Sequence, residues 1–338
     1  MKDLCNYSLL AHNTFGIEAC CDRFLEYNTI QEAQLVAQMV KGQEPLLLIG
    51  GGSNLLLTND FHGIVVHSAI KGHEVVSETT DEVLLRVGSG EVWDDIVALC
   101  VDNGWYGAEN LSLIPGEVGA SAVQNIGAYG AEASHIIDKV ETVRLIDGSC
   151  CQMMASECCY GYRQSRFKQD WKNRYLITHV TYRLSKTFSP CLDYGNIRAE
   201  LEQRAISNPT AQQLRDVIIA IRQQKLPDPK IEGNAGSFFM NPVVSRKQFE
   251  QLLTQYPQMP HYFVDEAHEK IPAGWLIDQC GWKGRSLGRA GVHSRQALVL
   301  VNRGGATGSD IVRLCQAVCR DVKAQFDILL FPEVNIIS

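Results

Sequence analysis

The sequence predicts an α+β protein made of two or three domains. Short alternating strands recur between about residues 70 and 186, as in VLLRVG, KVETVRLID and YLITHVTYRL, and the helix EVWDDIVALCVDNG lies among them. QKLPDPKIEGNAG, at 224–236, combines prolines and glycines in close succession, which marks a domain boundary. The length of 338 residues suits two or three domains of ordinary size.

The first 68 residues predict a small unit of strands and one helix. Thr29 caps the amphipathic segment 29–42, a glutamate stands at the third position after it, and Gly42 is a stop signal. The apolar run 45–49 predicts a buried strand, GGGSN a turn, and 55–57 and 63–67 two further strands.

The second half of the chain predicts a separate domain after the helix at 210–224. Helical patterns occur at 245–256, 273–280 and 309–326, and 297–302 predicts a strand. The terminal segment 328–337 predicts a strand that rejoins an earlier domain. No repeat or low-complexity tract is visible, which excludes solenoids and propellers.

Composition and charge favour small-molecule chemistry. The net charge is −7, with no basic excess for nucleic acid or anionic lipid. No apolar run is long enough to span a membrane or resembles a signal peptide. The twelve cysteines include adjacent pairs that disulfide geometry disfavours, so we expect reduced thiols in a cytoplasmic protein. Cys315 and Cys319 share one helical face, where core packing is favoured over a metal or redox role.

Two glycine-rich segments are the first candidates for a ligand site. IGGGSNLLL, at 49–57, suits a pyrophosphate bound by backbone N–H groups, although a tight hairpin turn explains the glycines equally well. It lacks the last glycine of the dinucleotide fingerprint. The segment 113–132 is rich in glycine and alanine and predicts irregular backbone that can lie against a flat ring; a buried crossover is the alternative.

Three residues are candidates for catalysis. Arg163, in YGYRQSRFK, can stabilise negative charge beside Tyr162, or the segment is a surface strand with solvated arginines. Ser237, in NAGSFFMNP, can transfer a proton or simply occupy a turn. Glu333 follows a proline and by itself indicates an edge or capping carboxylate. No metal site and no nucleophile-elbow, zinc-protease or P-loop motif is present.

In this order, the segments closely resemble the UDP-N-acetylenolpyruvoylglucosamine reductases, flavoenzymes of bacterial peptidoglycan precursor synthesis. Matching blocks run nearly from end to end, beginning with NTFGI at 13–17 and closing with FPEVNII at 331–337. LDYGNI, at 192–197, is similar to the form of the family whose added loop carries a tyrosine over the substrate.

The resemblance implies an FAD-binding fold of the vanillyl-alcohol-oxidase (p-cresol methylhydroxylase) type. Two flavin-binding subdomains are expected at 1–68 and 69–226, the second with a substrate loop near 188–200. A substrate-binding α+β domain is expected at 227–325. Residues 326–338 would form a strand that carries Glu333 back to the flavin domain.

The resemblance also assigns site residues. The catalytic positions fall on Arg163, Ser237 and Glu333. The FAD-binding positions are Gly50, Gly51, Gly52, Ser53, Asn54, Leu55, Pro115, Gly116, Val118, Gly119, Ala120, Gln124, Asn125, Ile126, Gly127 and Ala128. The substrate-binding positions are Tyr129, Tyr162, Tyr194, Lys225, Asn241 and Gln296.

The implied reaction is the reduction of UDP-N-acetylglucosamine enolpyruvate to UDP-N-acetylmuramate, with non-covalent FAD and NADPH as hydride donor. Arg163 and Glu333 would stabilise an enolate-like species and Ser237 would donate the proton. We expect a monomer without nucleic-acid or membrane partners. The alternatives are another oxidase or dehydrogenase on the same flavin scaffold and a non-catalytic nucleotide-sugar-binding module.

Overall fold

The computed structural model describes residues 1–43 and 45–338, which divide into two compact units. Unit 1 consists of Met1–Tyr7, Cys21–Gly51 and His62–Arg222, and unit 2 of Ser8–Cys20, Gly52–Phe61 and Gln223–Ser338. The glycine-rich loop and helix α5 (Ala211–Lys225) each cross from one unit to the other. The assignment of FAD binding and substrate binding to separate domains stays a prediction.

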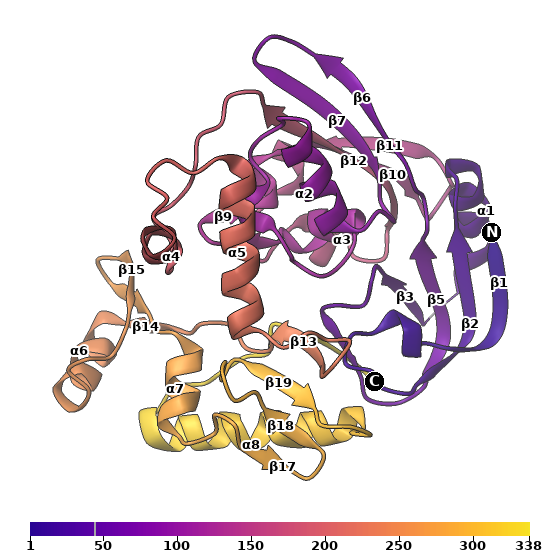
Figure 1. Cartoon of the computed structure of the whole chain (residues 1–338). Helices are drawn as coiled ribbons and strands as arrows, with labels where there is room; N and C mark the ends of the chain where they lie inside the picture. The colour runs from indigo at the N-terminus through magenta and orange to yellow at the C-terminus, as the bar shows by residue number, and fades with distance from the viewer. Residues whose placement is uncertain (44) are drawn as a thin grey trace. The chain divides into compact units, whose positions relative to one another are not determined.

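Unit 1 contains a four-stranded sheet in the order β1 (Lys2–Ser8), β2 (Cys20–Tyr27), β5 (Phe61–Ser68) and β3 (Leu46–Ile49) (Figure 1). The predicted helix is α1 (Ile30–Val40), and the Thr29 side chain accepts a hydrogen bond from the Glu32 N–H as an N-cap. Its apolar face, with Val36 and Val40, packs with Leu25 and Val66 of the sheet. The capping signal therefore predicted the start of the helix correctly.

A second sheet of unit 1 is entirely antiparallel. Its order is β11 (Cys150–Met154), β10 (Ile137–Arg144), β12 (Tyr175–Ser185), β7 (Glu82–Gly88) and β6 (His73–Glu78). Helices α2 (Trp93–Asp102) and α3 (Val118–Gln124) share its core, in which Trp93 packs edge-on against Tyr182. Helices α4 (Ile197–Gln203) and α5 pack on each other through Ile197, Leu214 and Ile218.

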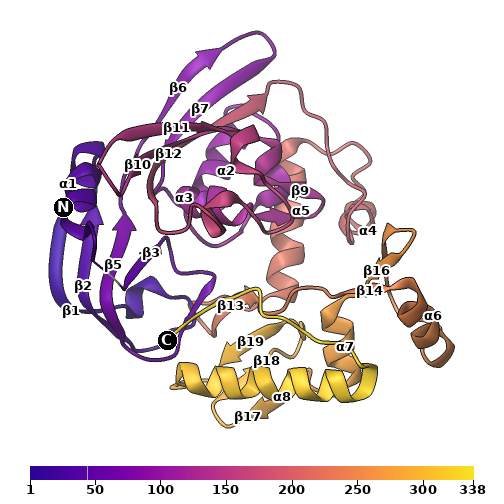
Figure 2. The same ribbon diagram turned by 180° about the vertical axis from the view of Figure 1, so that it is seen from behind.

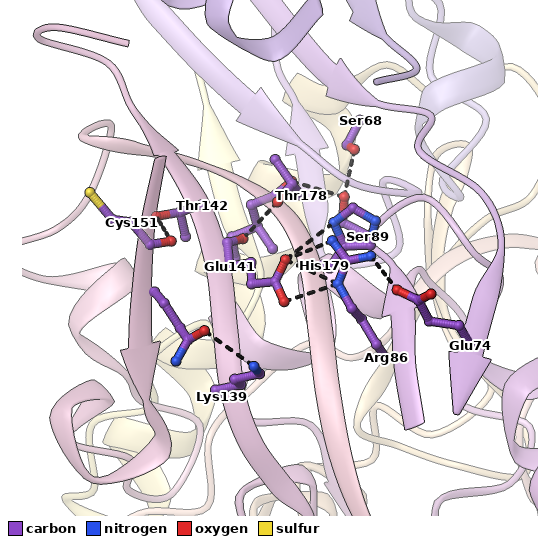
Figure 3. A network of polar contacts seen from close by, with 12 residues as sticks. Ser68, Glu74, Arg86, Ser89, Lys139, Glu141, Thr142, Cys151, Thr178 and His179 are labelled. Carbon is purple, nitrogen blue, oxygen red and sulfur yellow. Dashed lines mark hydrogen bonds and ion pairs between the residues drawn. The ribbon is translucent and has the colours of Figure 1, made fainter. Parts of the chain in front are cut away.

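Polar contacts link the strands of this sheet to their surroundings (Figure 3). Arg86 on β7 donates to both Glu141 oxygens and to Glu74, at 2.7–3.1 Å. Ser89, directly after β7, lies 2.6 Å from the Ser68 hydroxyl, and its N–H donates to the Thr178 carbonyl. The turn at 88–91 is thereby attached to strands of both sheets.

Helix α3 corrects one prediction, because the segment 113–132 was expected to be irregular throughout. The N–H groups of Val118 and Gly119 donate to the carbonyls of Glu91 and Ser89, at 2.9 and 2.8 Å. A Cβ at Gly119 would lie 2.9 Å from the Ser89 Cβ, so a small residue is needed there. Contacts with the turn at 88–91 therefore hold a helix that the local sequence does not favour.

The main sheet of unit 2 has the order β13 (Gly233–Ser237), β19 (Val299–Asn302), β18 (Ala290–Val292) and β17 (Ser286–Leu287). Helix α8 (Gly308–Phe326) begins in a capping box of Thr307 and Asp310 and lies along this sheet beside the shorter α7 (Ala273–Gln279) (Figure 2). Cys315 on α8 is buried, as the core interpretation predicted.

Smaller elements complete the chain. Unit 2 also holds the sheet β14 (Val243–Ser245), β16 (His268–Lys270) and β15 (Tyr262–Asp265), with α6 (Arg246–Gln255), and the parallel pair β4 (Leu55–Leu57) and β20 (Asn335–Ile337). Unit 1 also holds the pair β8 (Gly127–Ala128) and β9 (Ala131–Glu132). Short 3-10 turns occupy Leu10–His12, Glu109–Leu111, Ala133–His135, Ala155–Cys158 and Arg166–Lys168.

The terminal segment 328–337 is strand only at its end. Pro332 and Glu333 precede β20, and their partners are Phe238 and Phe239 rather than a regular ladder. A proline supplies no N–H to a sheet, which shortens the predicted strand.

No disulfide links the cysteines in the described part of the chain. All twelve cysteines there are free thiols. Within residues 1–43 and 45–338, no helix is long and apolar enough to cross a membrane, and no cluster of His, Cys, Asp and Glu could hold a metal ion.

Candidate active site

The glycine-rich loop at 50–54 connects strands of two different sheets. β3 pairs in parallel with β5, whereas β4 pairs in parallel with β20, so the hairpin alternative is wrong. A Cβ at Gly50 would lie 3.1 Å from the Ala120 Cβ, and one at Gly51 would lie 3.4 Å from the Gly116 Cα. The two glycine-rich segments predicted to bind the cofactor are therefore neighbours in unit 1.

The remainder of this loop lies in unit 2, where its shape depends on Gly52. Gly52 has a φ of +67°, and a Cβ there would lie 1.9 Å from the His12 carbonyl oxygen. Asn54 accepts hydrogen bonds from the N–H and the side chain of Asn335, and its own amide reaches the Glu333 carbonyl at 3.5 Å. The loop is thus attached to the segment that carries Glu333.

The loop fits the diphosphate of FAD. Gly50 and Gly51 are half-buried, and across the described residues no protein group accepts from their N–H groups. Glycine positions that leave backbone N–H groups available are the usual way to bind a phosphate without a side chain. Gly50, Gly51 and Gly116 would hold the cofactor's diphosphate and adjoining ring by close backbone approach, whereas Gly119 is buried against Ser89 and its N–H is already bonded.

The side chains of two other predicted ring-lining residues, Asn125 and Gln124, form hydrogen bonds within the protein. The fully buried Asn125 has a φ of +47°, and its side chain bonds with Ser134, Glu132 and Gly161 at 2.8–2.9 Å. The Asn125 amide is therefore occupied within the protein. Gln124 accepts from the Lys168 ammonium at 2.7 Å, and the segment continues into β8.

Arg163 lies in a turn rather than in the surface strand that was one interpretation of YGYRQSRFK. Gly161 and Gln164 form an isolated bridge, and Arg163 has a φ of +55°. Its Nη2 donates to the Gly127 carbonyl at 2.7 Å, and its guanidinium lies 5.5 Å from the centroid of the half-exposed Tyr162 ring. The guanidinium is thereby fixed against the glycine-rich segment.

A second arginine beside this group, Arg222 on α5, was missed by the sequence analysis. Burial lowers the pKa of Arg222, the charges of Tyr129 and Asp94 oppose this effect, and the charge of Arg163 adds to it. Its Nε is buried and has no acceptor among the described residues. The unfavourable charge interaction between the two arginines would be relieved by a bound anion in this part of unit 1. The available signal was an arginine three positions before Lys225 in IRQQKLP.

The predicted substrate loop lies against Tyr129 in unit 1. The Asn110 side-chain amide donates to the carbonyls of both Tyr129 and Cys191, at 2.7 and 2.9 Å. A Cβ at Gly130 would lie 3.5 Å from the Tyr194 Cβ. The structure therefore brings together Tyr129 and Tyr194, whose ring is half-exposed.

Ser237 and Glu333 are brought together in unit 2. Ser237 ends β13 opposite Val299, and its side chain is exposed. The carbonyl of Phe238, the next residue, accepts from the Glu333 N–H at 2.8 Å. The two predicted catalytic residues are thus on paired segments of the chain.

Two predicted substrate-binding residues of unit 2 each lie against the start of α7. The Asn241 side chain accepts from the Ala273 N–H at 2.9 Å, and the Gln296 Oε1 would lie 3.2 Å from a Cβ at Gly274. Lys225, also in unit 2, is half-buried at the end of α5.

Two protein-family models match separate parts of the chain. A family model described as "UDP-N-acetylenolpyruvoylglucosamine reductase, C-terminal domain" matches residues 228–337. A model described as "FAD binding domain" matches residues 22–152. The FAD-binding segment therefore includes both glycine-rich regions up to the β10–β11 hairpin.

Individual relatives match along the whole chain. The UDP-N-acetylenolpyruvoylglucosamine reductase of Bacteroides fragilis strain YCH46 is 56% identical over 331 residues, which covers 98% of this chain and 99% of the relative. The enzyme of the same name from Porphyromonas gingivalis strain ATCC 33277 is 47% identical over 333 residues, with 98% of each chain covered.

A solved structure supports the fold. The UDP-N-acetylenolpyruvylglucosamine reductase of Thermus caldophilus superposes with a TM-score of 0.69 at 20% identity, covering 100% of this chain and 98% of that one. The predicted α+β FAD-binding fold is confirmed, as is the prediction of an FAD-dependent oxidoreductase. The chain belongs to the UDP-N-acetylenolpyruvoylglucosamine reductase family.

Proposed function

We propose that this protein catalyses the NADPH-dependent reduction of UDP-N-acetylglucosamine enolpyruvate to UDP-N-acetylmuramate in the cytoplasm, acting as a monomer. Beyond the family membership, the observation that carries the proposal is the pairing of the Ser237 and Glu333 segments in unit 2. An exposed hydroxyl and a carboxylate on paired segments of the chain suit delivery of a proton to a carbon that carries negative charge.

FAD, when bound, supplies hydride transfer from NADPH to the enolpyruvyl double bond. In the proposal the backbone of residues 50–55 holds the diphosphate and the 115–128 segment lines the ring. The protein's own contribution is then orientation and charge.

In the proposal, Arg163 and Glu333 stabilise the negative charge that develops on the substrate. Hydride addition to the vinyl carbon remote from the carboxylate leaves negative charge on the neighbouring carbon and on the carboxylate. The Arg163 guanidinium stays protonated, and its orientation is already set by the 2.7 Å bond to Gly127, so little reorganisation is needed to stabilise that charge. Glu333 assists, and the Ser237 Oγ–H donates the proton to the carbon.

Substrate binding is assigned to three tyrosines of unit 1 and to polar residues of unit 2. Tyr129, Tyr162 and Tyr194 in unit 1 supply rings and hydroxyls for the sugar and diphosphate. Lys225 supplies a point charge for phosphate, and Asn241 and Gln296 supply amides. Arg222 adds a second guanidinium on the Arg163 side, suited to the substrate's carboxylate or diphosphate.

An anaerobic two-step experiment tests the proposal. The purified protein should be yellow, bleach with NADPH, and regain its colour when the enolpyruvyl nucleotide is added, with UDP-N-acetylmuramate as product. Rapid recovery with oxygen but none with the nucleotide would indicate an oxidase on the same scaffold. Absence of bound flavin would indicate a non-catalytic nucleotide-sugar-binding module.

A further inference from the structure

Glu117 places a carboxylate directly beside the glycine-rich loop. It precedes α3, and its Oε2 would lie 3.4 Å from a Cβ at Gly50. Its Cγ would lie 3.6 Å from a Cβ at Gly51. A carboxylate at this distance repels the diphosphate that the loop is proposed to bind, unless a positive charge compensates for it.

His67 on β5 can provide this positive charge. Its Nε2 lies 3.1 Å from both carboxylate oxygens of Glu117, and its Nδ1 lies 3.0 Å from Glu26 Oε2. The His67 side chain is only 10% exposed. Because each ring nitrogen faces a carboxylate, only the doubly protonated imidazolium donates to both.

The charges around His67 balance when the ring is protonated. Lys2 on β1 lies 2.7 Å from the other Glu26 oxygen, so two cations face two carboxylates. Tyr27, on the same strand as Glu26, stays neutral because burial raises its pKa, and the Phe24 ring stacks at 6.4 Å from the imidazole. Deprotonation of His67 therefore leaves one uncompensated negative charge beside the loop.

The direction of the His67 pKa agrees with this geometry. Burial lowers the pKa of His67, but the hydrogen bond and charge of Glu117, together with those of Glu26, outweigh burial and hold the pKa above its usual value. The imidazolium is thus present below the ordinary histidine pKa, and it is lost as the pH rises through the raised pKa.

We propose that His67 is a positioning residue for FAD, whose imidazolium compensates for the Glu117 carboxylate so that Gly50 and Gly51 accept the cofactor diphosphate. The inference rests on the proposed diphosphate-binding role of this loop. It makes FAD affinity dependent on pH: binding weakens as His67 loses its proton and Glu117 faces the diphosphate without a counter-ion.

Dilution of the full-length flavin-loaded protein tests the inference. The released flavin is measured by its fluorescence between about pH 6 and about pH 9. The dissociation constant for FAD should rise roughly tenfold over this range in the unmodified protein. Glu117→Gln should bind FAD tightly at every pH, and His67→Gln weakly at every pH.

The double variant distinguishes charge compensation from a merely structural role. His67→Gln leaves Glu26 and Glu117 without their shared partner and can impair folding, whereas His67→Gln with Glu117→Gln should regain tight, pH-independent binding. His62→Gln is the matched control, because His62 lies on the same strand, is 83% exposed and pairs with Asp22. It should keep the pH dependence of the unmodified protein.

Two results would overturn the inference. One is a dissociation constant that does not change with pH in the unmodified protein; the other is weaker binding by Glu117→Gln, which would make Glu117 a direct contact of the cofactor. Gly51→Val separates these from a failure of the proposed function, because a branched side chain packed against Gly116 and Glu117 should displace the loop and abolish FAD binding. Normal FAD binding by Gly51→Val would mean that the diphosphate lies elsewhere.

Discussion

Two non-glycine residues beside the candidate site adopt left-handed backbone conformations. Arg163 has a φ of +55° and Tyr129 one of +49°. Such conformations cost about 1 kcal/mol or more and persist where the surroundings determine them. Here the Gly127 carbonyl binds the Arg163 guanidinium and the Asn110 amide binds the Tyr129 carbonyl. These hydrogen bonds hold the strained backbone of Arg163 and Tyr129 in place, and so fix the orientation of two predicted site residues.

Replacing Arg222 should separate stability from activity. Arg222→Gln removes a buried guanidinium whose Nε has no acceptor in the described chain, so the free energy of unfolding should rise by about 1 kcal/mol. The kcat/KM for the enolpyruvyl nucleotide should fall roughly 10- to 100-fold, because a charged hydrogen bond to the substrate is lost.

Thermal unfolding and steady-state kinetics measure the two effects of Arg222→Gln. Arg222→Lys should recover part of the activity by restoring the charge. The control is Arg204→Gln, which removes an arginine that pairs with Glu200 at 2.8 Å on α4. A less stable Arg222→Gln variant with unchanged kinetics would show that the arginine is structural.

Ser237→Ala should affect only the second half-reaction. Reduction of the flavin by NADPH needs no proton from Ser237, whereas the substrate carbon does, so substrate-driven reoxidation should slow by roughly 100- to 10,000-fold or more. Anaerobic stopped-flow absorbance separates the two steps. Ser309→Ala, at another exposed serine of unit 2, is the control. Equal slowing of both steps would contradict the assigned role.

At the scale of elements, the segment 191–195 belongs to the predicted substrate loop. Asn110 holds it to Tyr129 through the Cys191 carbonyl, and Tyr194 lies beside Gly130 with 48% of its surface exposed. The contacts come from a side chain more than 80 residues earlier in the sequence. The position of the loop therefore depends on the helical turn at Glu109–Leu111.

Tyr194→Phe should weaken substrate binding more than it slows turnover. Loss of the hydroxyl removes a contact made equally in the ground and transition states, so the KM for the nucleotide sugar should rise while kcat changes little. The NADPH half-reaction should hardly change. Stopped-flow comparison of the half-reactions decides the matter: a defect confined to NADPH oxidation would mean that this segment is not the substrate lid.

At the scale of the whole molecule, the predicted cofactor loop and the segment that carries Glu333 are connected through the chain itself. The glycine-rich loop starts in unit 1 against the 115–120 segment and ends in unit 2, where Asn54 binds the Glu333 and Asn335 segment. The same loop thereby takes part in both units.

Backbone contacts of this kind predict that FAD is bound without a covalent link. No cysteine or histidine in the cofactor segments matches a flavinylation position, and the glycines at 50–52 offer only hydrogen bonds. Heat or acid should therefore release the flavin, which is then measured in the supernatant. Yellow colour retained by the denatured polypeptide would contradict this expectation.

The sequence by itself determined the helices with local start signals and the membership of the family. Thr29 and Thr307 cap α1 and α8 through residues only three positions away, so a short window contains the whole signal. The order of the motifs likewise predicted the fold and the candidate site residues, because the motifs occur in the same order as in the family.

The tertiary structure decided what depends on residues distant in sequence. Helix α3 exists because the turn at 88–91 accepts its first N–H groups, and no local pattern contains that turn. His67 and Glu117 are 50 positions apart in the sequence. The role proposed for Arg222 depends on its charge interaction with Arg163. Burial and charge pairing are properties of the folded surroundings, so these groups could be recognised only once the strands and helices were in place.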